Sequence, residues 1–437
     1  MSSLSMGFLS LGAIIFLIAI RVPIAVALGG VALVGMAAVR NLDVALGLAK
    51  ETPFNFAAHW SLTAIPMFLL MGTIAHNAGL SSALFNAARL WFGALPGGLA
   101  VAANLACAGF AAASGSSVAT AAAMGRIAIP EMLKAGYDKG LATGVVASAG
   151  TLGALIPPSI LFVLYGIFAE VSIVKLLIAG LLPGLLTAAV YTLLIMGRCW
   201  LNPALAPKVD MEQFDDPWRE RWRSLVPIWP LVLLIGAIIG GLYSGFVTPT
   251  EAGAVGAFIA VLIALFQGRL TAANFIESMR ETASASARIF FVAVGAVMYT
   301  KFLAFTGLPE FFGQWIVDIG LNPIVLVIGT SLIYLFLGMF LDPLGVLLLT
   351  LPILLPMFDA LELDLIWLGV LVVKYLEIGM LTPPVGFNVY VIKSVVGDTI
   401  PLETIFKGVG WFLVAEVFIM ALLIAFPQIS LWLPSRL

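Results

Sequence analysis

Two stretches of this sequence place main-chain oxygens inside long apolar runs. One is Gly150-Thr-Leu-Gly-Ala-Leu-Ile-Pro-Pro-Ser159 and the other is Gly379-Met-Leu-Thr-Pro-Pro-Val-Gly-Phe-Asn388. Each contains a proline pair, which removes two backbone N–H donors and disfavours helical geometry in the preceding residue. Carbonyl oxygens freed in this way find no water in hydrocarbon, so they persist only against protein, a cavity or an ion. We therefore expect both stretches to be broken membrane helices that expose oxygen atoms.

Oxygen atoms of this kind suit a small, hard cation such as Na⁺. The candidate carbonyls belong to Gly153, Ile156, Gly379 and Thr382, and the candidate hydroxyls belong to Ser114, Ser116, Ser117, Ser159 and Thr382. The half-helix N-termini also offer N–H groups to an anion. The sequence has no histidine cluster, and Cys107 and Cys199 are its only cysteines, which argues against a transition metal and against a disulfide framework.

The composition indicates the environment of these elements. Of 437 residues, 62% are hydrophobic and 10% are charged, whereas a soluble domain carries about 25% charged residues. The chain is therefore expected to be an all-α, polytopic membrane protein with room for roughly ten spans of ~20 residues in the lipid bilayer. A net charge of −2 gives no argument for nucleic-acid binding. Met6–Ile20 is expected to be a retained span, because no basic segment precedes it.

The sequence matches itself when its second half is laid on its first at one constant shift. This shift superposes Pro23 on Pro249, Pro130 on Pro356, Gly153 on Gly379, and the first proline pair on the second. Because glycine and proline interrupt helices at chosen places, a constant register among them predicts two repeats with shared architecture. The predicted domains are a first repeat over 1–198, a cytoplasmic linker over 199–224 and a second repeat over 225–437.

Each repeat is expected to contain the same elements in the same order. Each repeat begins with two spans. A polar stretch follows (about 40–59 and 267–284), which is predicted to be a separate interfacial helix, and after it a third span (about 60–78 and 286–305). The remaining elements are a hairpin (98–133 and 324–358), the broken helix (139–169 and 365–396) and a final span (171–197 and 405–427).

The hairpins decide the predicted topology. In the first, two apolar segments of about 15 residues meet at Ser114-Gly-Ser-Ser117, and ~22 Å of helix does not cross a ~30 Å hydrocarbon core. The second has its tip at Gly338–Gly345. If both hairpins are re-entrant, each repeat has about five crossings and the two repeats are inverted. The distribution of Lys and Arg then places the linker inside and both termini on the periplasmic side.

Several charged residues lie within the apolar segments. The shift places Asp342 opposite Ser116, so a carboxylate is expected at the second tip, where it binds substrate or caps a helix. Lys301 is expected either to pair with a substrate carboxylate or to extend to the interface. Lys374 and Glu377, three residues apart, predict a structural ion pair, and Glu416 predicts a hydrogen-bonded scaffold residue.

Other functions fit parts of this pattern. Small residues such as the tip serines also allow close helix packing. An intramembrane hydrolase would use Ser116 as nucleophile, but no histidine or lysine near the tip supplies a base. A channel or lipid scramblase would lack a fixed Na⁺ stoichiometry. We therefore favour a secondary transporter and expect no enzyme activity.

The combined motifs resemble the large membrane subunit of the tripartite ATP-independent periplasmic (TRAP) transporters, the DctM type. The resemblance covers nearly the whole chain and depends on these segments: Ser114-Gly-Ser-Ser-Val-Ala-Thr120, Ile127-Ala-Ile-Pro-Glu-Met132, Gly150–Ser159, Leu341-Asp-Pro-Leu-Gly345 and Leu381-Thr-Pro-Pro-Val-Gly-Phe-Asn388.

This resemblance implies Na⁺-coupled uptake, across the cytoplasmic (inner) membrane of bacteria or archaea, of an organic acid such as a C4-dicarboxylate, sialic acid or another carboxylated sugar. It implies two partners, a periplasmic substrate-binding protein (DctP type) and a small four-helix membrane subunit (DctQ type). It also implies an elevator mechanism, similar to that of the ion-transporter superfamily. A single-subunit Na⁺/dicarboxylate symporter of related fold is the alternative.

The resemblance assigns at least two Na⁺ ions and a substrate space between them. One ion would be bound by Ser114, Gly153, Ile156 and Pro157, and the other by Gly338, Gly379 and Thr382. The residues expected to line the substrate space are Ser116, Ser117, Ser159, Lys301, Asp342 and Asn388.

Overall fold

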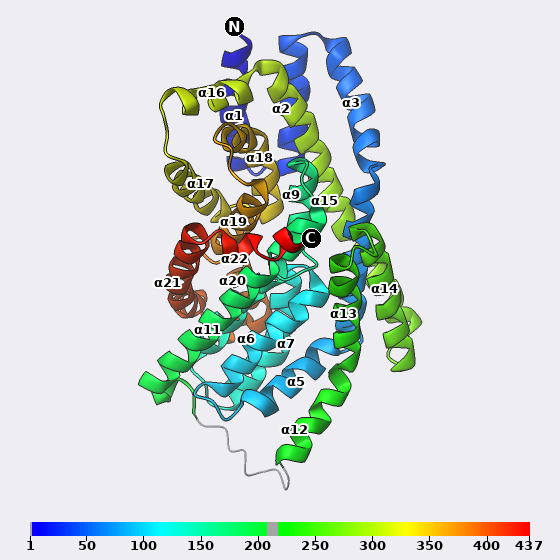
Figure 1. Cartoon of the computed structure of the whole chain (residues 1–437), viewed down its shortest axis with the longest axis vertical. Coiled ribbons are helices and arrows are strands. Elements are labelled where there is room, and N and C mark those ends of the chain that lie inside the picture. Colours follow the sequence, from blue (N-terminus) through cyan, green and yellow to red (C-terminus); the bar gives the residue numbers. More distant parts are fainter. Residues whose placement is uncertain (1, 208–216) are drawn as a thin grey trace.

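A computed structural model describes residues 2–207 and 217–437, which form helices and contain no strand. Figure 1 shows the helices: α1, α2, α3 and α15 lie in the upper part of the molecule, and α5, α6, α7 and α11 lie in the lower part. Lys208, Asp210, Glu212, Asp215 and Asp216, which the sequence assigns to the linker, lie outside the described residues.

The first half of the chain contains eleven α-helices. They are α1 (Ser3–Ala19), α2 (Ile24–Val39), α3 (Leu42–Ala57), α4 (Ala64–Asn77), α5 (Leu80–Phe92), α6 (Gly98–Ser114), α7 (Ser117–Lys134), α8 (Lys139–Gly150), α9 (Ile160–Phe168), α10 (Ile173–Ala179) and α11 (Leu181–Leu201). A 3₁₀ turn over Thr151–Ala154 follows α8.

The described part of the second half contains another eleven. They are α12 (Pro217–Leu225), α13 (Trp229–Tyr243), α14 (Pro249–Phe266), α15 (Ala272–Thr306), α16 (Leu308–Asp318), α17 (Pro323–Gly338), α18 (Pro343–Ala360), α19 (Leu365–Gly379), α20 (Phe387–Val396), α21 (Leu402–Ala425) and α22 (Gln428–Leu431). Because α11 extends to Leu201 and α12 begins at Pro217, both ends of the predicted 199–224 linker lie within helices.

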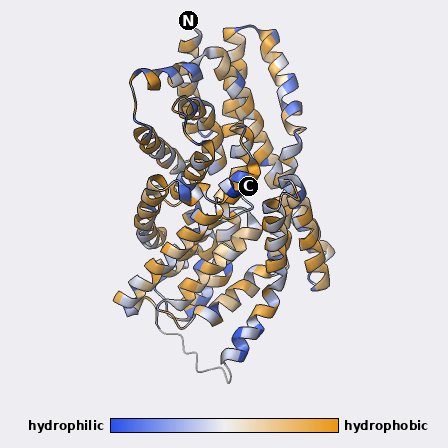
Figure 2. Cartoon of the chain, viewed as in Figure 1, coloured by the Kyte–Doolittle hydropathy of each residue, from blue (hydrophilic) through white to orange (hydrophobic). Residues whose placement is uncertain are grey.

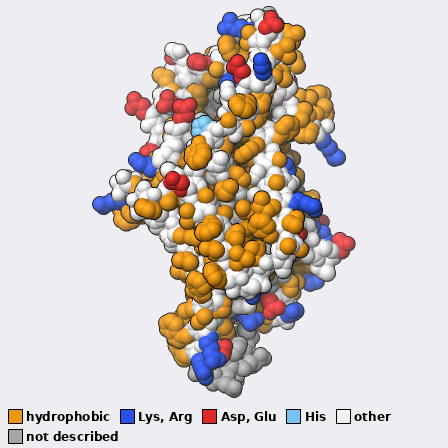
Figure 3. Space-filling model, turned by 90° about the vertical axis from the view of Figure 1, so that its right-hand side faces the viewer, with side chains coloured by type: hydrophobic (Ala, Val, Ile, Leu, Met, Phe, Trp, Pro, Cys, Tyr) orange, Lys and Arg blue, Asp and Glu red, His pale blue; other side chains and the backbone are white. Residues whose placement is uncertain are grey.

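The surface of the molecule fits a bilayer. Within the described residues, six helices are long and apolar enough to span a membrane, or seven if the bent pair Leu42–Ala57 and Trp60–Asn77 is one span. Apolar residues dominate most helices, and hydrophilic ones gather at α12 (Figure 2). On the face in Figure 3, hydrophobic side chains cover much of the middle, and charged side chains lie mainly toward its ends and edges. The chain is therefore a multi-pass membrane protein.

Both proline pairs lie in breaks between helices. The first pair falls between the 3₁₀ turn and α9, and the second falls between α19 and α20. The shift that lays Pro23 on Pro249 also superposes the first and last residues of α7 on those of α18. The same shift also matches N-cap residues. Ser116 and Asp342 cap α7 and α18, and Asp138 and Asp364 cap α8 and α19. Each side chain accepts a bond from a backbone N–H that the helix leaves unpaired.

One predicted element is wrong. The polar stretch at 267–284 and the span at 286–305 form a single helix, α15, which is 35 residues long. In the first half, α3 and the segment that continues into α4 are instead bent by 58°. Pro66 lies in the first turn of α4, where its missing N–H is tolerated. At the corresponding place in the second half, α15 continues through Val292 without a break.

Two separate clusters of buried apolar side chains form the core. The smaller cluster joins α1, α2, α3 and α15, with contributions from α16 and α18. The larger cluster contains α6 to α9, α19, α20 and their neighbours. This division matters for the functional site, because a cavity lies where the two groups of helices meet.

Candidate functional site

One cavity has a volume of about 700 Å³ and brings together both tips and both breaks. Gly115–Ser117 and Leu341–Leu344 contribute the hairpin tips, while Ala154, Ile160, Met380 and Phe387 contribute the breaks. The turn between α1 and α2 and the 285–292 segment of α15 also line the cavity. The cavity therefore lies where the tips and breaks meet the α1–α2–α15 group.

Three of the six predicted substrate residues line this cavity. They are Ser116, Ser117 and Asp342. Ser116 accepts a bond from the backbone N–H of Ala119 at 3.4 Å, and Asp342 Oδ2 accepts one from Gly345 at 3.0 Å. Asp342 is therefore both a helix cap and a cavity residue, so the two roles proposed from the sequence are compatible.

The other three lie outside the cavity lining. Ser159 is fully buried and caps α9 through the N–H of Phe162. Asn388 is also fully buried, and its side-chain amide donates to the carbonyl of Ala147 at 3.4 Å. Lys301 Nζ donates to Thr52 Oγ1 at 3.2 Å, which joins α15 to α3. The structure thus gives these three residues packing and capping contacts.

Four charged residues line the cavity, and three of them were not predicted as site residues. They are Arg21, Arg288, Asp342 and Glu377. Arg21 lies in the α1–α2 turn with a left-handed backbone (φ 68°), and Arg288 lies on α15. The sequence offered one signal for Glu377, because an ionisable residue in an apolar helix indicates function. It offered none for the arginines, which we used only for topology.

Glu377 joins the second broken helix to the first hairpin. Its side chain is 1% exposed, and Oε1 accepts a bond from Ser117 Oγ at 2.6 Å. The predicted Lys374–Glu377 ion pair is wrong, because Lys374 Nζ lies 2.6 Å from Glu416 Oε1 on α21. Glu416 also accepts a bond from Tyr191, so its predicted role as a hydrogen-bonded scaffold residue agrees with the structure.

The first predicted cation site contains several oxygens close together. Ser114 Oγ lies 2.6 Å from Thr120 Oγ1. A Cβ added to Gly153 would lie 2.5 Å from the Ser116 carbonyl oxygen and 2.6 Å from Thr120 Oγ1. Gly153 therefore fits against the hairpin tip only because it has no side chain. Thr120, the last residue of the first quoted motif, also lies at this contact, although it is not among the predicted ligands.

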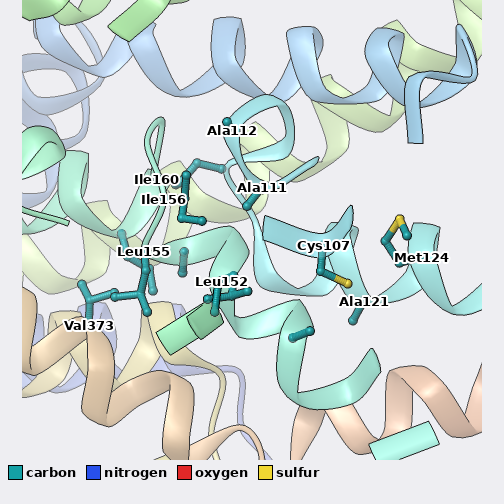
Figure 4. Close-up of a cluster of buried hydrophobic side chains, with 14 of the residues drawn as sticks. Cys107, Ala111, Ala112, Ala121, Met124, Leu152, Leu155, Ile156, Ile160 and Val373 are labelled. Carbon is teal, nitrogen blue, oxygen red and sulfur yellow. The ribbon is translucent and has the colours of Figure 1, made fainter. Parts of the chain in front are cut away.

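Ile156 and Pro157 belong to the same break and are buried. Ile156 packs beside Gly184 of α11, where an added Cβ would lie 2.6 Å from Ile156 Cγ1. Figure 4 shows Leu152, Leu155, Ile156 and Ile160 of this break in one apolar cluster with Ala111 and Ala112 of α6. The side chains of the break thus anchor it in the core, and a cation would meet only its main chain.

The second predicted cation site is formed by two glycines and a threonine. A Cβ added to Gly379 would lie 2.8 Å from Gly338 Cα and 3.4 Å from the Gly338 carbonyl oxygen. Thr382 Oγ1 donates to the carbonyl of Ile378 at 2.7 Å. This bond uses the hydroxyl proton and leaves oxygen lone pairs available. The break and the end of α17 are therefore in close main-chain contact.

Residues 11–429 match the family described as the tripartite ATP-independent periplasmic transporter, DctM component. The C4-dicarboxylate TRAP transporter large permease protein DctM of Pseudomonas aeruginosa is 37% identical over 388 residues, covering 88% of each chain. The sialic acid TRAP transporter large permease protein SiaM of Vibrio cholerae is 34% identical over 398 residues, covering 89% of this chain and 91% of that protein. Both relatives are permeases rather than enzymes.

The fold is similar to that of a solved transporter. The YdaH transporter of Alcanivorax borkumensis superposes with a TM-score of 0.62 at 14% identity, covering 88% of this chain and 89% of that one. The family match spans nearly the whole sequence, both permeases are similar to it over most of their length, and the helical fold agrees. On this evidence the chain belongs to the DctM family, the large permease components of TRAP transporters.

Proposed function

We propose that this chain carries out Na⁺-coupled uptake of an organic acid across the cytoplasmic membrane of a bacterium or archaeon. The observation that carries the proposal is the cavity of about 700 Å³, which is lined by both hairpin tips, both helix breaks, Arg21 and Arg288. Such a cavity has room for a small organic molecule, and guanidinium groups bind carboxylates through a bidentate fork.

The names of the relatives support an organic acid as substrate. The Pseudomonas protein is named for C4-dicarboxylates and the Vibrio protein for sialic acid, and both ligands carry a carboxylate. Ser116, Ser117 and Asp342 supply hydrogen-bonding groups to the same space. Ser159, Lys301 and Asn388 would act indirectly, through the helices that they cap or join.

The two glycine-lined contacts fit Na⁺ as the coupling ion. At the first, Ser114, Thr120 and the Ser116 carbonyl place hard oxygens beside Gly153, and the main chain of Ile156 and Pro157 continues the break. At the second, Gly338, Gly379 and Thr382 provide carbonyl and hydroxyl oxygens. Ligand sets of this kind, at unwound helices, bind Na⁺ in secondary transporters. We therefore assign one ion to each set.

An elevator mechanism with two inverted repeats accounts for the arrangement. The helices and caps that match at the constant internal shift support the repeat. The hairpins and broken helices would move as one body against α1, α2 and α15, and the cavity lies between the two groups. The predicted orientation, with both termini periplasmic, follows from the distribution of Lys and Arg.

The family implies two partners. A periplasmic substrate-binding protein of the DctP type would deliver the acid to the cavity. A small four-helix subunit of the DctQ type would pack against the membrane-facing helices, which expose large apolar side chains such as Phe258, Val232 and Leu193.

Reconstitution tests this proposal directly. Proteoliposomes containing the chain, its small subunit and its binding protein should take up labelled succinate or sialic acid only with an inward Na⁺ gradient, at a fixed Na⁺ stoichiometry. Uptake without Na⁺ would refute the coupling. Uptake by the chain alone, without a binding protein, would instead support the single-subunit symporter.

A further inference from the structure

The turn between α1 and α2 has a strained backbone at Arg21. This residue follows the end of α1 in the left-handed conformation (φ 68°). Its N–H donates to the carbonyl of Ile18 at 2.9 Å, and the N–H of Val22 donates to that of Leu17 at 2.9 Å. This pair of bonds is the Schellman motif, whose left-handed position normally holds glycine because a Cβ is disfavoured there.

The corresponding turn in the second half of the chain does hold glycine. The constant internal shift brings the turn between α13 and α14 onto this one, and its left-handed residue is Gly245 (φ 69°). The same two bonds close α13, from Gly245 to Leu242 and from Phe246 to Gly241. The helix end itself therefore does not require an arginine, and the reason for Arg21 must lie in its side chain.

That side chain lines the cavity of about 700 Å³. No described residue forms a hydrogen bond or an ion pair with the Arg21 guanidinium. Arg288, the other arginine of the lining, already donates to the carbonyl and the hydroxyl of Ser284 at 3.3 and 3.1 Å. A guanidinium has five N–H donors, and at Arg21 all of them are available to a ligand in the cavity.

We propose that Arg21, rather than Arg288, binds the carboxylate of the substrate, and that the strained turn is retained to place this guanidinium in the cavity. This inference rests on the proposed function of the cavity as the substrate site. Strained backbone conformations cluster at ligand sites, where the surrounding structure maintains them. The planar fork of an arginine donates two parallel bonds to a carboxylate, whereas a lysine offers only a point charge.

Arg21→Gly tests both parts of the proposal, because it removes the guanidinium and the strain together. The full chain in lipid nanodiscs is titrated, at saturating NaCl, with succinate, sialic acid and the methyl esters of both acids, which lack the carboxylate charge. The wild-type protein should bind at least one acid more tightly than its ester. The variant should bind that acid about 10- to 100-fold more weakly, the contribution of a hydrogen bond to a charged group, and the ester unchanged. Its unfolding temperature should be no lower than that of the wild type, because glycine adopts this conformation without strain.

The chain supplies two matched controls, Glu170→Gly and Glu362→Gly. Both glutamates are left-handed (φ 54° and 52°), and the residue after each donates to a carbonyl five residues back at 3.1 Å, as Val22 does. Neither lines the cavity, so both variants should relieve the strain and bind the acid as the wild type does.

Side-chain variants separate charge from backbone. Arg21→Gln keeps the strain and should weaken acid binding as Arg21→Gly does, so the test remains decisive if the glycine variant fails to fold. Arg21→Lys should recover only part of the loss, and Arg288→Gln should have a smaller effect than Arg21→Gln.

Unchanged acid binding in both Arg21→Gly and Arg21→Gln would overturn the proposal. Equal losses for acid and ester, a larger loss in Arg288→Gln, or binding of neither acid by the wild type would also overturn it. A lower unfolding temperature of Arg21→Gly would refute the retention of a strained turn. The transport assay distinguishes these results from failure of the proposed function, which absence of Na⁺-driven uptake for every acid would reject.

Discussion

Gly153→Ala is the most direct perturbation of the first cation site. Gly153 lies in the 3₁₀ turn that precedes the first proline pair, and its backbone does not require glycine for conformational reasons. It contacts the hairpin tip so closely that an added Cβ would lie 2.5 Å from the Ser116 carbonyl oxygen and 2.6 Å from Thr120 Oγ1. An alanine therefore adds one methyl group at the place where the proposed Na⁺ ligands meet.

The size of the effect follows from this distance. Ordinary contacts begin at 3.4 Å, so the tip and the break must separate by roughly 1 Å. Overpacking of this kind costs about 1–3 kcal/mol. If the contact is tightest when Na⁺ is bound, this cost falls on Na⁺ binding and weakens it by about 5- to 150-fold.

Two measurements on the variant check the prediction. The first is the Na⁺ concentration that gives half-maximal uptake in proteoliposomes, which should rise by at least about fivefold. The second is the increase in unfolding temperature on addition of NaCl, which should shrink. Gly410→Ala on α21 is the matched control, because an added Cβ there meets nothing within 4 Å.

Wild-type Na⁺ dependence in the Gly153 variant would refute the assignment of this contact to a cation. Equal destabilisation with and without Na⁺ would show that the glycine serves packing alone.

Two further predictions concern the second site and the buried ion pair. Thr382→Val keeps the shape of the side chain and removes the hydroxyl, so we expect several-fold weaker Na⁺ dependence and a loss of about 1 kcal/mol in stability, measured by uptake and thermal unfolding. Lys374→Met leaves Glu416 buried without its cation, and we expect a loss of about 3–5 kcal/mol, whereas Lys374→Met combined with Glu416→Leu should recover at least half of it in a double-mutant cycle.

Each of these has a clear contrary result. Unchanged Na⁺ dependence of Thr382→Val would remove that hydroxyl from the second site. Thr399→Val is a suitable control because Thr399 is exposed and its hydroxyl donates to the nearby Val396 carbonyl. For the ion pair, a double variant no more stable than Lys374→Met would mean that Glu416 does not depend on Lys374 in the folded protein.

Local sequence signals predicted the helical elements well. The breaks followed from the proline pairs, because proline removes a donor wherever it occurs in a helix. The turns at the tips fall where small or acidic residues interrupt the apolar sequence, and the caps are local interactions. The change in polarity within 267–305 predicts a boundary, whereas α15 runs through it as one helix. Hydropathy cannot show whether a helix continues across that change.

The sequence by itself determined the membrane class, the family, the positions of the breaks and the oxygen-rich motifs, because all of these are properties of residues near one another in the chain. Only the tertiary structure decided which side chains meet. In the structure, Lys374 pairs with Glu416, which is 42 residues away in the chain, and not with Glu377, which is three residues away. Arg21 and Arg288 line the same cavity as Glu377. Charge and hydrogen-bonding partners in a helical membrane protein depend on the packing of distant helices, which no local spacing encodes.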